Sequence, residues 1–140
     1  MKKRIAGGMI AALFVMVLAA GCATAPKGPT DAEIIAGLMK ECVALADTLD
    51  IDKLMTYFSP TFSDPQFGDK QGTEEFLKSA KDSGLLAGFK VDVSQAVTTI
   101  KDDSATVEPV EVSGSFGSAM LTFYSQKIDG KWLITAIDHP

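Results

Sequence analysis

The chain has 140 residues, 46% of them hydrophobic, with 13 basic and 18 acidic side chains. This length fits one domain, and the acidic balance argues against nucleic-acid binding, which needs a basic surface. Two cysteines and one histidine exclude a disulfide-rich scaffold and a multi-histidine metal site. We therefore expect neither a metal nor a cofactor.

Residues 1–21 resemble the signal peptide of a bacterial lipoprotein. A basic start at residues 2–4 precedes a run of 16 apolar and small residues at 5–20. A helix that spans a bilayer needs about 20 apolar residues, so this run is short for a permanent anchor. The resemblance implies that Cys22 receives a lipid and that cleavage occurs just before it.

Residues 22–30 are expected to form the lipidated cysteine and a short tether, which contains two prolines. Ala23 stands where an aspartate would favour retention in the inner membrane. In a Gram-negative cell the resemblance therefore implies a protein on the periplasmic face of the outer membrane, where its acyl chains anchor it firmly. Lipidation of Cys22 would leave Cys42 without a disulfide partner, and Cys42 lies on an apolar helical stripe.

Three helices are predicted in the first half of the remaining chain. Thr30 and Glu33 have capping-box spacing, and apolar residues then recur every three or four positions, which predicts a helix over 31–49. A shorter helix is expected over 51–58, where the sequence Ser-Pro follows, and a third over 73–84, which ends in glycine.

From residue 89 the apolar period changes to two, which predicts strands. Asp129-Gly130 is a strong hairpin signal. Pro109 cannot donate a backbone hydrogen bond, so its strand has an edge, a bulge or a break there. Helices followed by hairpin-linked strands predict an α+β domain over 31–140, with helices on one face of an antiparallel sheet. The expected strands are 89–93, 104–112, 117–128 and 131–138.

Three segments in this order resemble the nuclear transport factor 2-like superfamily, also called SnoaL-like or ketosteroid-isomerase-like. They are the end of the second helix at 54–59, the loop 64–68 followed by 72–76, and the closing hairpin 127–134. The resemblance implies a cone-like fold in which N-terminal helices pack against a curved antiparallel sheet and leave a pocket at the open end. The superfamily includes isomerases, dehydratases, ligand binders and interaction modules, so the fold does not define the function.

The likeness to ketosteroid isomerase supplies candidate catalytic residues. That enzyme uses a carboxylate base and stabilises its enolate with a tyrosine and a protonated acid. Asp64, before Pro65, stands at the position of the base, while Cys42 replaces the tyrosine and Tyr124 replaces the acid. The catalytic set is therefore incomplete.

The leading hypothesis is a non-catalytic envelope lipoprotein whose domain binds a small apolar ligand or a partner protein. The alternative is an isomerase or dehydratase that uses Asp64 as general base and Tyr124 as hydrogen-bond donor. A second alternative is a structural module that assembles as a homodimer.

Aromatic residues around Asp64 and the only histidine complete the predicted pocket. Each also has a purely structural explanation: an aspartate before proline often starts a turn, aromatic residues pack in cores, and a penultimate residue often frays. Strict alternation places His139 on the strand face of Thr135 and Ile137, opposite Trp132 and Ile134. The expected pocket residues are Tyr57, Phe58, Phe62, Phe67 and His139.

Overall fold

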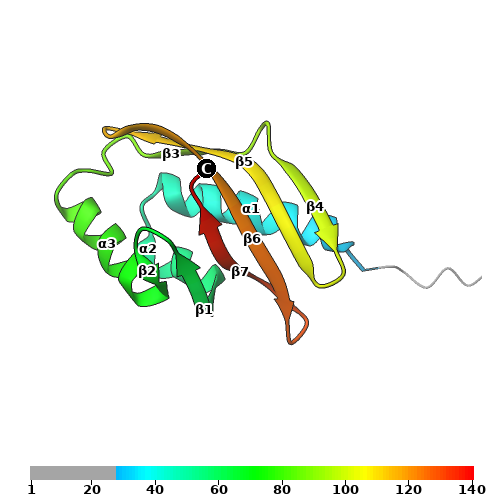
Figure 1. Cartoon of the computed structure of the whole chain (residues 1–140). Helices are drawn as coiled ribbons and strands as arrows, with labels where there is room; N and C mark the ends of the chain where they lie inside the picture. The colour runs from blue at the N-terminus through cyan, green and yellow to red at the C-terminus, as the bar shows by residue number, and fades with distance from the viewer. Residues whose placement is uncertain (1–27) are drawn as a thin grey trace, which may run out of the picture.

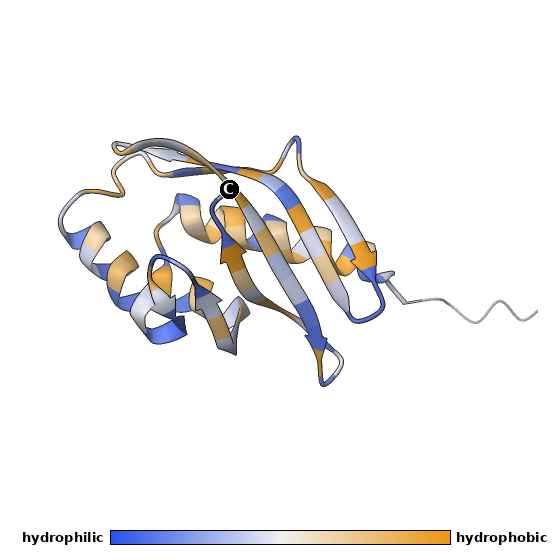
Figure 2. Cartoon of the chain, in the orientation of Figure 1, coloured by the Kyte–Doolittle hydropathy of each residue, from blue (hydrophilic) through white to orange (hydrophobic). Residues whose placement is uncertain are grey.

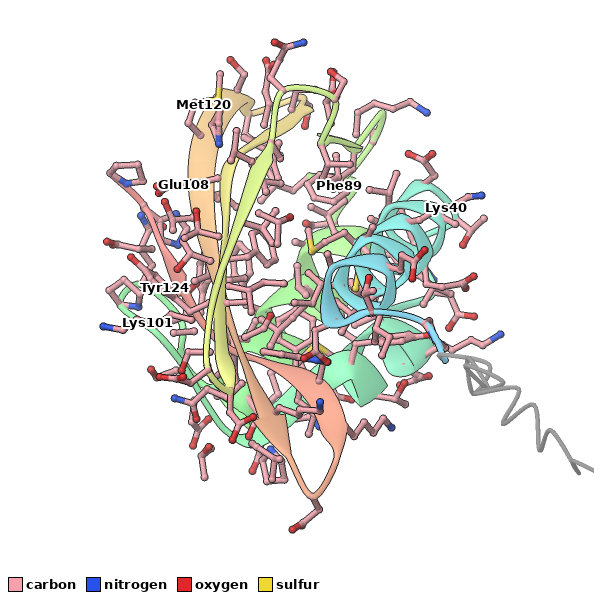
Figure 3. The ribbon with its side chains drawn as sticks, turned by 90° about the vertical axis from the view of Figure 1, so that its right-hand side faces the viewer. Lys40, Phe89, Lys101, Glu108, Met120 and Tyr124 are labelled. Atoms are coloured by element: carbon pink, nitrogen blue, oxygen red, sulfur yellow. The ribbon has the colours of Figure 1, made fainter. Side chains whose placement is uncertain are left out.

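The structure is a computed structural model, and it describes residues 28–140. The expected signal peptide, Cys22 and most of the tether lie outside these residues. The described chain forms two layers, in which α1 (Asp31–Asp47) lies against one face of a curved sheet (Figures 1 and 3). None of the helices in residues 28–140 has both the length and the apolar character needed to cross a bilayer.

The first helix begins where the sequence predicts. The Thr30 hydroxyl accepts a hydrogen bond from the Glu33 amide at 3.3 Å, and Glu33 Oε2 accepts one from the Thr30 amide at 2.7 Å. This capping box satisfies amide groups that a helix start leaves without partners. Asp50 caps the next helix, α2 (Ile51–Leu54), which continues as the short 3-10 helix η1 (Met55–Tyr57).

The third helix, α3 (Lys70–Asp82), starts three residues before the predicted position. Asp69, and not Thr73, is its cap, because the Asp69 carboxylate accepts a hydrogen bond from the Gly72 amide at 2.9 Å. Thr73 consequently lies inside the helix and is buried.

The sheet is mixed, whereas the sequence predicts an antiparallel one. Its order is β2-β1-β7-β6-β5-β3, and β4 pairs with β5. All pairs are antiparallel except β1 with β7, which run parallel. The strands β1, β2 and β4 do not follow from the sequence pattern, because proline occurs in the first and the others are short or exposed. The strands are β1 (Phe58–Asp64), β2 (Gly68–Asp69), β3 (Lys90–Asp92), β4 (Val97–Lys101), β5 (Ser104–Gly114), β6 (Gly117–Ile128) and β7 (Lys131–Asp138).

Two irregularities bend the long strands. In β5 the pairing register shifts between Val107 and Val110, so of the edge, bulge or break predicted at Pro109 the structure has a bulge. In β7 it shifts at Thr135, since Ser125 pairs with Ile134 but the preceding residue of β6 pairs with Ala136. Deviations of this kind change which residues face the helices.

The bulge at Thr135 corrects the predicted faces of β7. Trp132 and Ile134 are buried in the core, and beyond the bulge Ile137 packs against the same core. Strict alternation would place Ile137 on the opposite face, but one extra residue in the strand restores it to the inner face. His139 follows Ile137 with the same orientation.

The hydrophobic core lies between α1 and the inner face of the sheet. In Figure 2 hydrophobic and hydrophilic residues alternate along β5, as expected for a strand with one buried face. The predicted stripe of α1 is buried over most of its length, although Ile34 is 38% exposed. From α1 the core includes Ile35, Leu38, Met39, Cys42 and Leu45.

Candidate functional site

A cavity of about 350 Å³ lies between the helices and the inner face of the sheet. Side chains of α1, α2, α3, the segment between α3 and β3, and five strands (β1, β3, β5, β6 and β7) form its wall. Leu85 and Phe116 are 41% and 46% exposed, so they mark the edge of the cavity that faces solvent. The Ser115 hydroxyl joins the two loops at this edge by donating to the Leu85 carbonyl at 2.6 Å.

The wall is apolar because apolar residues recur with the period of the helix or strand that carries them. Residues three or four positions apart share a face of a helix, so α3 presents Thr73, Phe76 and Leu77 together. Every second residue of a strand faces one side, so β6 presents Ala119, Leu121 and Phe123. The other apolar lining residues are Met39, Cys42, Ala46, Leu49, Ile51, Leu54, Phe58, Phe67, Leu85, Leu86, Phe89, Val91, Val112, Phe116 and Ile137.

Asp64 is one of the few polar residues in this wall, and its side chain is only 2% exposed. Its Oδ1 accepts hydrogen bonds from the amides of Gln66 at 2.7 Å and Phe67 at 3.0 Å. This is the turn that an aspartate before proline favours. Its Oδ2 lies 3.0 Å from Nε2 of His139. The carboxylate is therefore held by three partners.

His139 reaches Asp64 from the end of β7. Its ring contacts Phe67 edge-on, with centroids 6.2 Å apart, and Phe67 stacks on Phe76 at 3.9 Å. These contacts order a residue that we would otherwise expect to fray. Among residues 28–140, Nδ1 of His139 has no hydrogen-bond partner, and His139 is one of the lining residues of the cavity.

Thr73 adds a second polar group to this part of the wall. It is 4% exposed, and its hydroxyl has no hydrogen-bond partner among the described residues. A buried hydroxyl without a partner costs free energy unless something satisfies it. Thr73 lies one helical turn before Phe76 in the sequence. This spacing would identify Thr73 as a lining residue only if the start of α3 at Lys70 were known.

The structure brings together only part of the predicted site. Asp64, Phe58, Phe67 and His139 line the cavity. Phe62 lies behind the wall, in the core, where its ring meets that of Phe58 edge-on at 4.8 Å. Tyr57 packs against the edge of the core and is not among the lining residues.

Tyr124 lies on the other face of the sheet from Asp64. It is 39% exposed, because its neighbours Phe123 and Ser125 face inward and side chains alternate along β6. Figure 3 shows Tyr124 and Met120 on the side of the sheet away from α1, and Phe89 between the sheet and the helix. The structure therefore separates the predicted base from the predicted donor.

Cys42 lines the cavity as an inert group. Burial raises the pKa of its thiol to about 12, with a smaller contribution from the charge of Glu41. Such a thiol is neither a nucleophile nor a metal ligand at neutral pH. In the part of the chain that the structure describes, no three His, Cys, Asp or Glu residues are grouped so that they could hold a metal ion.

No family model and no curated protein sequence matches the chain. Solved structures do match it. The protein Bd1075 from Bdellovibrio bacteriovorus is 18% identical, with a TM-score of 0.64. The match covers 75% of this chain but only 38% of Bd1075.

Two further matches cover nearly the whole of the smaller proteins concerned. A Nostoc punctiforme protein of unknown function with a cystatin-like fold is 20% identical over 79% of this chain and 92% of its own, with a TM-score of 0.61. An NTF2-like protein of unknown function from Shewanella oneidensis is 17% identical, with a TM-score of 0.60. The match covers 77% of this chain and 97% of the Shewanella protein. The chain therefore has the nuclear transport factor 2-like fold, an α+β cone that is also described as cystatin-like.

Proposed function

We propose that this domain binds a small, mostly apolar molecule in its cavity and catalyses no reaction on it. The cavity of about 350 Å³ with its apolar wall carries this proposal. Ligand sites in proteins are concave and mostly apolar, with a few polar groups that set orientation. An apolar cavity of about 150 Å³ already binds benzene, so a molecule with two fused rings is a suitable first probe.

Two observations count against the enzymatic alternative, one on the proposed base Asp64 and one on the proposed donor Tyr124. Asp64 accepts hydrogen bonds from two backbone amides and lies 3.0 Å from His139, which counts against it as a general base for a substrate. Tyr124 faces away from the cavity and supplies no donor there. The experiment on this point is incubation of the protein with an unsaturated ketone or an epoxide, and turnover that Asp64→Asn abolishes would overturn the non-catalytic proposal.

Ligand binding is tested by native mass spectrometry on residues 23–140 produced without lipid. All core residues and strands lie between Asp31 and Asp138, so this protein keeps the complete domain. An added mass of a few hundred daltons supports the proposal. Failure to retain either a native ligand or an added bicyclic probe contradicts it.

We further propose that the domain is attached to the cell envelope through lipid on Cys22, on the periplasmic face of the outer membrane in a Gram-negative cell. The capping box at Thr30 supports a short tether, because the folded domain begins directly after residue 30. Eight extended residues, 23–30, span at most about 28 Å. Incorporation of labelled palmitate that is lost in Cys22→Ala, together with fractionation, tests this anchorage.

A second copy of the chain is a second candidate partner. On the outer face of β6, the side chains of Met120 and Tyr124 are 50% and 39% exposed. Sedimentation velocity over a range of concentrations tests this association. A monomer at every concentration contradicts the dimer without affecting the ligand proposal.

A further inference from the structure

The polar groups of the cavity define the kind of molecule that fits it. Asp64 and His139 are joined directly, and His139 contacts Phe67, which stacks on Phe76 of α3. Thr73 lies one helical turn before Phe76 on the same helix face. These contacts place Asp64, His139 and Thr73 in one part of a wall whose only other polar lining residue, among residues 28–140, is Gln66.

The Asp64–His139 pair determines which nitrogen of the imidazole is the acceptor. Oδ1 of Asp64 already accepts two backbone hydrogen bonds, and Oδ2 can only accept, so Nε2 of His139 is the donor. In a neutral imidazole the proton is then on Nε2, and Nδ1 carries the lone pair. His139 lines the cavity and Nδ1 has no partner among residues 28–140, so Nδ1 is the acceptor that remains for a ligand.

The charges of the wall exclude an anionic ligand head. The lining residues include the Asp64 carboxylate but no lysine or arginine. A carboxylate or phosphate would enter beside an existing acidic group, without a permanent cation to compensate it. A neutral group that donates a hydrogen bond satisfies Nδ1 without this penalty.

We infer that the ligand is an uncharged, mostly apolar molecule with a hydroxyl group, which donates to Nδ1 of His139. Asp64 is the positioning residue, since it sets the imidazole tautomer and does not touch the ligand. The Thr73 hydroxyl, which is buried and has no partner among the described residues, lies in the same part of the wall. This inference rests on the proposed function, because it assumes that the cavity binds a small molecule.

The test uses three probes of similar size: 1-naphthol, 1-methylnaphthalene and 1-naphthaldehyde. 1-Naphthol can donate a hydrogen bond, 1-naphthaldehyde can only accept one, and 1-methylnaphthalene can do neither. We expect 1-naphthol to bind about tenfold more tightly than 1-methylnaphthalene, because only the hydroxyl can donate a hydrogen bond to Nδ1. Dissociation constants come from titrations followed by NMR, on residues 23–140.

Asp64→Asn provides the decisive variant. Its amide carbonyl keeps the two backbone hydrogen bonds, while its NH₂ group donates to Nε2 and so moves the imidazole proton to Nδ1. We expect the preference for 1-naphthol to fall and the affinity for 1-naphthaldehyde to rise. His139 is the only histidine in the sequence, so its ¹⁵N shifts report the tautomer without ambiguity. Thr98→Val, on the exposed strand β4, is the control that should leave all three affinities unchanged.

The outcomes separate the two proposals. Equal binding of the three probes to the unmodified protein overturns the hydroxyl inference and leaves the ligand-binding function standing. Binding of none of them overturns both. A tautomer change in Asp64→Asn without a change in probe preference also overturns the inference, because it shows that the ligand does not contact Nδ1.

Discussion

Asp64 and His139 are 75 positions apart in the sequence, yet their side chains meet with Oδ2 and Nε2 separated by 3.0 Å. The parallel pairing of β1 with β7 makes this contact possible, because it brings the end of β1 beside the end of β7. The β7 bulge then turns the histidine inward. The polar part of the cavity therefore depends on one strand pairing and one irregular residue.

Deletion of Thr135 should leave His139 facing the cavity. Without the extra residue, Ala136 follows Ile134 directly on the outer face, so Ile137 and His139 stay on the inner face. Insertion of one alanine between Ala136 and Ile137 should instead turn both residues to the outer face. We expect this insertion to abolish the Asp64 contact, visible as a change in the resonance of the single histidine, and the deletion is its control. An unchanged histidine spectrum in the insertion variant would contradict this account of β7.

Ala119→Trp should block the cavity while the domain stays folded. Ala119 lines the cavity and is itself exposed, so a large side chain can occupy ligand space without displacing the deeper core. We expect at least about a tenfold loss of probe affinity, since the lost apolar burial contributes about 25 cal/mol per Å². Ser118→Trp is the matched control, because the neighbouring residue faces the other side of the sheet. Equal affinity losses in both variants would argue against binding at this site.

Phe62→Ala should destabilise the domain by about 3–5 kcal/mol, because it leaves a hole in a packed core. Phe62 is 2% exposed and contacts Phe58, which lines the cavity. Urea unfolding followed by circular dichroism measures the change. Val97→Ala, at a residue that is 64% exposed, should cost far less and serves as control.

Asp31 should make stability depend on acid pH. The Trp132 indole donates to its Oδ1 at 2.9 Å and Lys127 Nζ lies at 2.9 Å, and these contacts, the first most strongly, lower the pKa of Asp31 below its ordinary value of 3.8. The folded state then binds fewer protons than the unfolded state. The contribution is complete above pH 3.8 and is lost as the pH falls through the lower folded-state pKa.

The measurement is the free energy of unfolding of the protein and of Asp31→Asn as the pH is lowered below about 4. The variant should show a weaker pH dependence there, and the indole N–H resonance of Trp132, the only tryptophan, should shift. Parallel pH curves for the two proteins would show that Asp31 does not titrate as the contacts require.

Cys42 should resist alkylation in the folded protein. Burial raises the pKa of its thiol to about 12, so at pH 8 very little thiolate is present. We expect iodoacetamide to modify it only as fast as the domain unfolds, and rapidly in concentrated urea. Fast modification in the native state, followed by mass spectrometry, would show that the cavity opens widely in solution. The same experiment with a bound probe should slow any residual reaction.

The amino-acid sequence by itself determined the helix starts at Thr30 and Asp50, the buried stripe of α1, the hairpin at Asp129-Gly130 and the irregularity at Pro109. These are local features, in which capping groups, apolar spacing and turn residues act over a few positions. Asp64 and His139 were also recognisable as candidates. Their partnership was not, because strict alternation cannot reveal a bulge.

Only the tertiary structure decided the rest. β1 becomes a strand because β7 and β2 pair with it, although its own sequence contains a proline and reads as a turn. Tyr124 faces solvent because its neighbours in β6, Phe123 and Ser125, face the core, and Thr73 is buried because α3 already starts at Lys70, with Asp69 as its cap. Strand pairing joins segments that are distant in sequence, and burial depends on how the elements pack, and local propensity encodes neither.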